Sequence, residues 1–130
     1  VLLSTLFPTP TSSLEVHRYT GSGVLDASDF TADTALATTG TLAHDVACGE
    51  LDGDSYPGVL HRPEFVVVHA GSGDVQVFYG YVSATSSATS TSALAAGSNP
   101  IAVAIGDLNG DGSGDVVIAN QGSDDLSIHL

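Results

Sequence analysis

The sequence predicts an all-β fold built from about two and a half copies of a four-stranded antiparallel sheet. Three observations lead to this prediction: an internal repeat, short segments of β-branched or alternating apolar residues, and frequent glycine-containing turns. The chain has 130 residues, of which 42% are hydrophobic, so it has enough apolar surface to form a packed core. No long segment has the apolar spacing of an amphipathic helix.

The repeat is clearest where an apolar segment runs into an acidic turn. Residues 46–54 (VACGELDGD) align with residues 103–111 (VAIGDLNGD) at an offset of 57. Further along, residues 71–77 align with residues 122–128 at an offset of 51. The change of offset places an insertion of six residues near 60–65 in the first copy.

Each copy has the pattern of short strands. Residues 75–78 and 126–129 alternate apolar and polar side chains with period two. Residues 66–68 and 116–118 are runs of β-branched residues, which suit buried strands. Several short strands in each repeat predict the four-stranded antiparallel blade of a β-propeller.

A third and fainter copy opens the chain, where residues 14–19 (LEVHRY) are similar to residues 75–79 (VQVFY). The chain then divides into the outer strands of a partial blade with a connection (1–40), a first full repeat (41–82), and a Ser/Thr-rich strand or connection with a second full repeat (83–130). Propellers usually close with about four to eight blades, so we expect further blades from copies of this chain or from a longer polypeptide. The first residue, Val1, also favours a processed or partial chain.

The acidic turn of the second copy carries the strongest chemical signal. In residues 107–115 (DLNGDGSGD), oxygen ligands occupy loop positions 1, 3, 5 and 9, and a backbone carbonyl is available at position 7. Ca²⁺ takes about six to eight oxygen ligands, and alternating acidic residues wrap the chain around it. Glycines between them are expected to provide positive φ angles. The predicted ligands are Asp107, Asn109, Asp111, Ser113 and Asp115, and the glycines are Gly110, Gly112 and Gly114.

Residues 103–120, with the pattern V-A-x-G-D-L-N-G-D-G-x-x-D followed by V-V-I-A-N, resemble the FG-GAP/VCBS repeats of integrin-α-like β-propellers. The resemblance covers most of residues 40–130. It implies a calcium loop between the first two strands of a blade, with Asp107, Asn109, Asp111 and Asp115 binding through side chains and Ser113 through its carbonyl.

The first copy departs from this pattern. Its loop keeps carboxylates at positions 1, 3 and 5, but position 9 is Gly58, which has no side chain. Fewer anionic ligands lower calcium affinity, so we expect a weak or vacant second site. Its predicted ligands are Glu50, Asp52, Asp54 and Tyr56.

The formal net charge is −13, from 15 Asp and Glu against two Arg. Such a surface repels phosphate, which argues against nucleic acids and anionic membranes and favours cations as partners. No segment is long and apolar enough to span a membrane. Cys48, the one cysteine, is expected to be a small buried side chain. The histidines lack metal-ligand spacing and are expected in turns or on strand surfaces: His17, His44, His61, His69 and His129.

Two Ser/Thr-rich tracts, residues 8–13 and 83–92, have the composition of O-glycosylated stalks, and the second is alternatively a Thr-rich outer strand of a blade. No Asn-x-Ser/Thr acceptor occurs.

The favoured function is that of a non-enzymatic, extracellular or cell-surface, calcium-binding structural or adhesion module. It would self-associate or belong to a larger propeller or fibre. No nucleophile elbow, phosphate loop or dinucleotide fingerprint is present. Two alternatives stay open: a glycan-binding lectin, for which the chain offers no Trp and few other aromatic residues, and accessory blades of a larger secreted enzyme.

Overall fold

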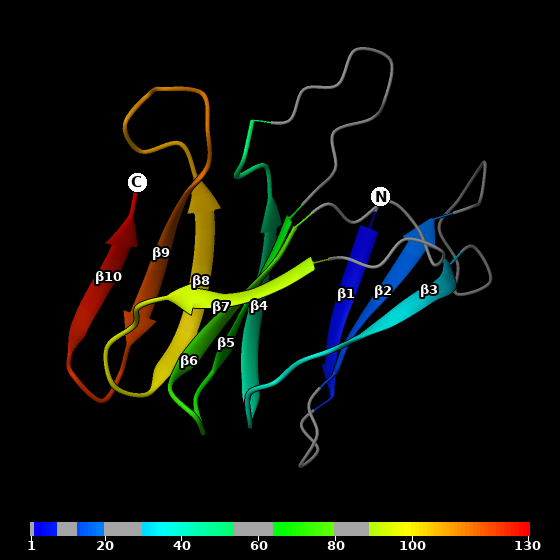
Figure 1. Cartoon of the computed structure of the whole chain (residues 1–130), viewed down its shortest axis with the longest axis horizontal. Coiled ribbons are helices and arrows are strands. Elements are labelled where there is room, and N and C mark those ends of the chain that lie inside the picture. The colour runs from blue at the N-terminus through cyan, green and yellow to red at the C-terminus, as the bar shows by residue number, and fades with distance from the viewer. Residues whose placement is uncertain (1, 8–12, 20–29, 54–63, 80–88) are drawn as a thin grey trace.

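The computed structural model describes residues 2–7, 13–19, 30–53, 64–79 and 89–130, with side chains described in 38–53, 64–79 and 94–130. The described part contains ten strands in three antiparallel sheets and no helix. Figure 1 shows the central sheet standing between the other two. The strands are β1 (Leu2–Phe7), β2 (Ser13–Tyr19), β3 (Phe30–Ala37), β4 (Ala43–Gly49), β5 (Glu64–His69), β6 (Asp74–Tyr79), β7 (Thr89–Leu94), β8 (Pro100–Gly106), β9 (Asp115–Asn120) and β10 (Asp125–His129).

The three sheets confirm the predicted all-β fold of an incomplete propeller or repeat array. The central sheet has the order β4-β5-β6-β7, in which each strand follows its predecessor along the chain. This is the up-and-down arrangement of a four-stranded blade. Its fourth strand, β7, lies at the end of the Ser/Thr-rich tract and pairs with β6.

The C-terminal sheet, β8-β9-β10, repeats the first three strands of the central sheet. In both sheets the first strand ends in a glycine paired with the acidic first residue of the second strand: Gly49 with Glu64, and Gly106 with Asp115. The N-terminal sheet has the order β1-β2-β3. In the described residues, it has no strand corresponding to β4 and β8, and the C-terminal sheet has none corresponding to β7.

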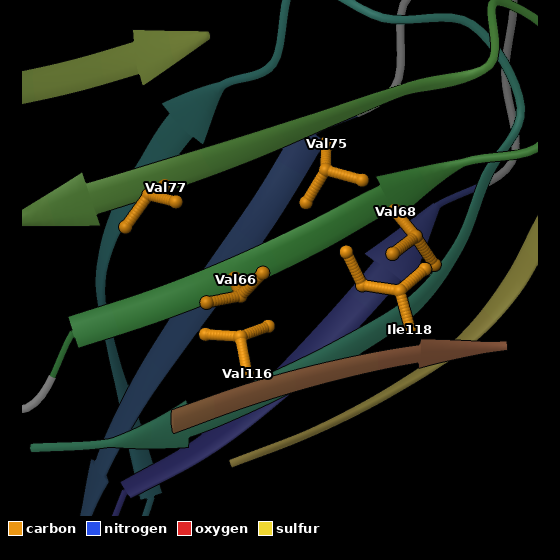
Figure 2. Close-up of a cluster of buried hydrophobic side chains, with 6 residues drawn as sticks. All are labelled: Val66, Val68, Val75, Val77, Val116 and Ile118. Carbon is orange, nitrogen blue, oxygen red and sulfur yellow. The ribbon is translucent and has the colours of Figure 1, made fainter. Parts of the chain in front are cut away.

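One cluster of buried apolar side chains lies between the central and C-terminal sheets. One face of β5 and β6 contributes four valines, which are at most 1% exposed, and β9 contributes Val116 and Ile118. Figure 2 shows the side chains of Val116 and Ile118 pointing toward those of Val66 and Val68 across the gap between the sheets. Burial of such β-branched side chains on both partners is the main force that holds one sheet on the next.

Polar contacts and a close approach also join these sheets through their inner strands, β4 and β8. The Asp45 carboxylate accepts a hydrogen bond from the Val103 amide at 3.0 Å. The Ile101 carbonyl oxygen lies 2.8 Å from His44 Nδ1. A Cβ atom at Gly49 would lie 2.6 Å from Ile105 Cγ2, so this strand crossing requires glycine.

The opposite ends of the two sheets share a second repeated motif. Leu42 and Asn99, which precede β4 and β8, both have positive φ (54° and 51°). Their carbonyl oxygens accept hydrogen bonds from the first residues of the β5–β6 and β9–β10 turns, Ala70 and Gln121, each at 3.0 Å. The same connection therefore enters both sheets, although sequence similarity in it is low.

Two expectations about single side chains are wrong. Cys48 is exposed rather than buried; it lies on β4, an edge strand that pairs with β5 alone among the described strands. His69 is fully buried rather than superficial, because β5 is a central strand and the connection at Gly40 covers its end. A Cβ atom at Gly40 would overlap the His69 ring.

Candidate functional site

The loop of residues 107–115 joins β8 to β9 and folds around its own acidic side chains. The Asp107 carboxylate accepts hydrogen bonds from the Gly110 amide at 2.6 Å and the Gly112 amide at 3.0 Å. Asp111 accepts one from the Ser113 amide at 2.8 Å. Asn109 Oδ1 accepts one from the Asp111 amide at 2.8 Å. These bonds hold the oxygen-bearing side chains on the inside of a tight turn.

Asp115 anchors the loop where β9 begins. It is 2% exposed, and its Oδ2 accepts hydrogen bonds from the Leu108 amide at 2.6 Å and the Asn109 amide at 3.2 Å. Two backbone donors compensate part of the cost of burying a carboxylate. Asp107, Asn109 and Asp111 are exposed, so the loop combines one buried acidic anchor with three oxygen-bearing side chains open to solvent.

Hydrogen bonds also favour the charged form of Asp111. The Ser113 backbone amide, followed by the Asn109 side chain, lowers the pKa of Asp111 below its ordinary value. The carboxylate is therefore ionised at neutral pH, as a calcium ligand must be.

The glycines of the loop have two different roles. Gly110 and Gly112 have φ of 80° and 92°, as the tight wrap predicts. The expectation of a positive φ at Gly114 is wrong. This residue is needed because a Cβ atom there would overlap the Glu50 carbonyl oxygen of the neighbouring loop.

The first loop contains an acidic cluster that differs from the predicted one. Glu50, Asp52 and Glu64 bring carboxylate oxygens within 4.8 Å of one another. Asp54 and Tyr56, the other predicted ligands, lie outside the described residues, as does Gly58. The structure brings Glu50 and Asp52 together with Glu64, which the sequence analysis did not consider.

Glu64 occupies the place that Asp115 has in the second loop. It is fully buried, and its Oε2 accepts a hydrogen bond from the Leu51 amide at 2.8 Å, as Asp115 does from Leu108. Gly53 has φ of 68°, similar to that of Gly110. The sequence held a signal for this residue, because the offset of 51 that applies after the insertion relates position 64 to position 115.

A pocket of about 310 Å³ lies beside the second loop, where the central and C-terminal sheets meet. Asp111, Ser113 and Asp115 form part of its wall. Tyr79 and His129 also line it, together with apolar side chains. His129 Nε2 lies 2.9 Å from the Ala95 carbonyl oxygen. The pocket therefore has acidic, aromatic and apolar surfaces next to the candidate metal loop.

A comparison with protein families matches residues 61–118 to the FG-GAP-like repeat. The match runs from the end of the first loop through β5, β6, β7 and β8 to β9, and it includes the entire second loop. No curated protein and no solved structure shows significant similarity to the chain.

Repeats of this kind form blades of β-propeller-like proteins, generally have structural or adhesive rather than catalytic roles, and typically occur in extracellular or cell-surface proteins. In the described part of the chain, no helix is long and apolar enough to cross a membrane. The arrangement of sheets and the family match agree with the resemblance that residues 103–120 indicated. Residues 61–118 thus match an FG-GAP-like repeat, and they lie in a stack of antiparallel sheets that is consistent with an incomplete propeller.

Proposed function

We propose that this chain is a calcium-binding structural or adhesive module of an extracellular β-propeller-like assembly. The observation that carries the proposal is the conformation of the 107–115 loop. Its backbone already wraps around three oxygen-bearing side chains, and the buried Asp115 closes the turn. Asp107, Asn109, Asp111 and Asp115 would hold Ca²⁺ through side-chain oxygens, and Ser113 would do so through its carbonyl.

The donor set fits a hard cation. All the side-chain donors are oxygens, three of them carboxylates, which is the ligand chemistry that Ca²⁺ prefers. The bound ion supplies positive charge that offsets repulsion among the carboxylates in a chain of net charge −13. Asp107, Asn109 and Asp111 accept hydrogen bonds within the loop, and the same three side chains would bind the ion.

The position of the loop favours a structural role. The loop connects the inner strand of one sheet to its second strand, and Gly114 lies against the Glu50 backbone of the preceding sheet. Fixing the loop therefore also fixes the joint between two sheets. If free calcium were about 100 times Kd, binding to the folded state alone would add roughly 2.7 kcal/mol to stability.

We also assign a second and weaker calcium site to Glu50, Asp52 and Glu64. Their oxygens lie within 4.8 Å of one another, and Glu64 has the strand position of Asp115. Glutamate is one methylene longer than aspartate and loses more side-chain entropy when its position is fixed. We therefore expect lower affinity here than at the second loop.

Isothermal titration calorimetry with Ca²⁺ on the metal-free chain tests both sites. Asp111→Asn keeps the shape of the side chain and removes one charge from an exposed ligand, so the tighter site should weaken by roughly tenfold or more. Glu64→Gln should remove the weaker binding step and leave the tighter one. Asp124→Asn is the matched control, because Asp124 is an exposed acidic residue outside both loops. Absence of calcium binding by the unmodified chain, or equal binding by D111N and D124N, would refute the assignment.

Glycan binding is a second candidate function, and the pocket beside the second loop favours it. Tyr79 offers a ring for stacking, and acidic side chains in the same wall can accept hydrogen bonds from sugar hydroxyls. Screening against a glycan array, with Tyr79→Ala as the comparison, tests this function. No bound glycan, or binding that Y79A leaves unchanged, would exclude the pocket as a sugar site.

A further inference from the structure

The C-terminal sheet exposes an apolar face on the side away from the core. Val116 and Ile118 of β9 point to the central sheet, so Val117 and Ala119, which alternate with them, face outward. Their partners across the strand pair, Leu126 and Ile128 on β10, share that outward face. We call Ala104, Val117, Ala119, Leu126 and Ile128 the outer face. Leu126 is 61% exposed and Ile128 is 54% exposed.

The same positions are buried in the central sheet. At the repeat offset of 51, Leu126 and Ile128 correspond to Val75 and Val77, each of which is 1% exposed. These valines are covered because the C-terminal sheet packs on them through Val116 and Ile118. The outer face is therefore the surface that receives the next sheet in this architecture, and it has no cover among the described residues.

The sheets are joined in a fixed direction. The central sheet presents its Val75 and Val77 face to the sheet that follows it along the chain. Its opposite face carries Phe65, Val67 and Phe78, at most 2% exposed, and lies toward the N-terminal sheet, whose strand β1 contacts β4. Figure 1 shows these two neighbours on opposite sides of the central sheet. Because each sheet presents one face to the sheet before it and the other face to the sheet after it, the two ends of the stack differ. One end is the outer face, and the other is the far side of the β1–β3 sheet.

We propose that the outer face docks on the β1–β3 sheet of a second copy of this chain, and that two copies close a ring of six sheets. The proposal rests on the assigned role as a propeller-type module and names its partner. The described residues form three sheets, fewer than the roughly four to eight blades of a closed propeller, whereas the same residues of two copies supply six. A head-to-tail contact whose rotation closes gives a finite ring rather than a filament.

The edges of the end sheets support the same partner. Strand β10 has β9 on one side, and no described strand pairs with its other edge; the same holds for β1 beside β2. Unpaired edges of this kind accept strands from another chain. At the C-terminal end of the stack, the open edge of β10 therefore lies beside the exposed side chains of Leu126 and Ile128.

Light scattering coupled to size-exclusion chromatography tests the proposal on the full 130-residue chain in calcium. The expected particle has twice the chain mass of 13.1 kDa. The double variant Leu126→Asp/Ile128→Asp should shift to the single-chain mass, because it places two charges in the joint. The control is Leu42→Asn, which removes a side chain that is equally exposed (56%) but lies in the connection before β4, where the second repeat has Asn99.

Hydrogen exchange then locates the other half of the joint. In the two-copy particle, the amides of β10 and of β1–β3 should exchange at least about tenfold more slowly than in the double variant, because local opening is suppressed in an interface. Thermal unfolding shows whether the double variant is folded, and calcium titration shows whether the metal sites survive. A single-chain particle, a larger open polymer, a mass that the double variant leaves unchanged, or no protection of β1–β3 would each overturn the proposal. Calcium binding does not depend on these outcomes, so failure of the joint is distinguishable from failure of the proposed function.

Discussion

Substitution of Gly114 by alanine isolates the contact between the two acidic loops. The added methyl group would lie closer than 3.0 Å to the Glu50 carbonyl oxygen and 2.9 Å from Ile105 Cγ2. Nonbonded carbon and oxygen atoms are most stable at separations of about 3.5 Å, so the loop and the neighbouring backbone must move apart by roughly 1 Å. Neither obstacle is the free end of a flexible side chain, because one is backbone and the other is a β-branched side chain packed against Gly49.

We expect this overpacking to lower the free energy of unfolding by about 2–3 kcal/mol. For a chain of this length, that corresponds to a decrease in Tm of roughly 10 °C. Circular dichroism at one protein concentration in calcium measures it directly. The matched control is Gly106→Ala, because a Cβ atom at Gly106 meets nothing within 4 Å and the residue has no positive φ.

Gly106→Ala should leave the free energy of unfolding within about 1 kcal/mol of the unmodified protein, since alanine also restricts the unfolded chain. Equal stability of the two variants would show that the loops do not approach each other as closely as the structure places them. It would also remove the physical link between the proposed calcium binding at the 107–115 loop and the contact between the central and C-terminal sheets.

Three further predictions follow from single residues. Gly110→Ala should cost about 1 kcal/mol through backbone strain alone, because φ is 80° and a Cβ atom at this residue would meet nothing within 4 Å; a urea titration that shows no loss would contradict this. Asp45→Ala should cost about 1–3 kcal/mol in the same assay, because it removes the acceptor for the Val103 amide between β4 and β8; unchanged stability would mean that this bond does not hold the joint. His69 should make stability depend on pH. Burial lowers its pKa below 6.5, and the charge of Asp74 only partly opposes this. The unfolded chain therefore binds the proton first, and stability present above pH 6.5 is lost as the pH falls toward the lower pKa of the folded state. His69→Asn, the residue found at the equivalent position 120, should flatten that pH dependence, and an unchanged slope would exclude His69 as its source.

The local sequence pattern was sufficient to predict the strands and the oxygen-rich turn of the second loop. Runs such as 66–68 and 116–118 specify strands because β-branched side chains fit the pleated surface of a sheet. The 107–115 loop is readable because its ligands, glycines and turn all lie within nine consecutive residues. The family match at residues 61–118 confirms the resemblance that these residues carry.

Strand register decided the composition of the first loop. The insertion lengthens the chain between Asp52 and the next strand, so counting nine positions from Glu50 leads to Gly58. The pairing of Gly49 with Glu64 places a carboxylate at the beginning of β5, where Asp115 stands at the beginning of β9. A loop can grow without moving the strand ends that it connects. Counting residues along the chain therefore fails to identify the acidic residue at the start of β5, whereas the strand register places it there.

Packing between sheets decided the burial of individual side chains. Cys48 and His69 have ordinary strand neighbours in sequence, yet one is exposed on an edge strand and the other is enclosed beneath Gly40. Gly114 looked like a residue of the loop's own turn, and its actual constraint comes from the Glu50 backbone in the loop that follows β4. The sequence by itself determined which segments become strands and which loop gathers oxygen-bearing side chains, because both depend on neighbours along the chain. Only the tertiary structure decided which faces are covered and which carboxylates meet, because those depend on residues that the stacking of separate sheets brings together.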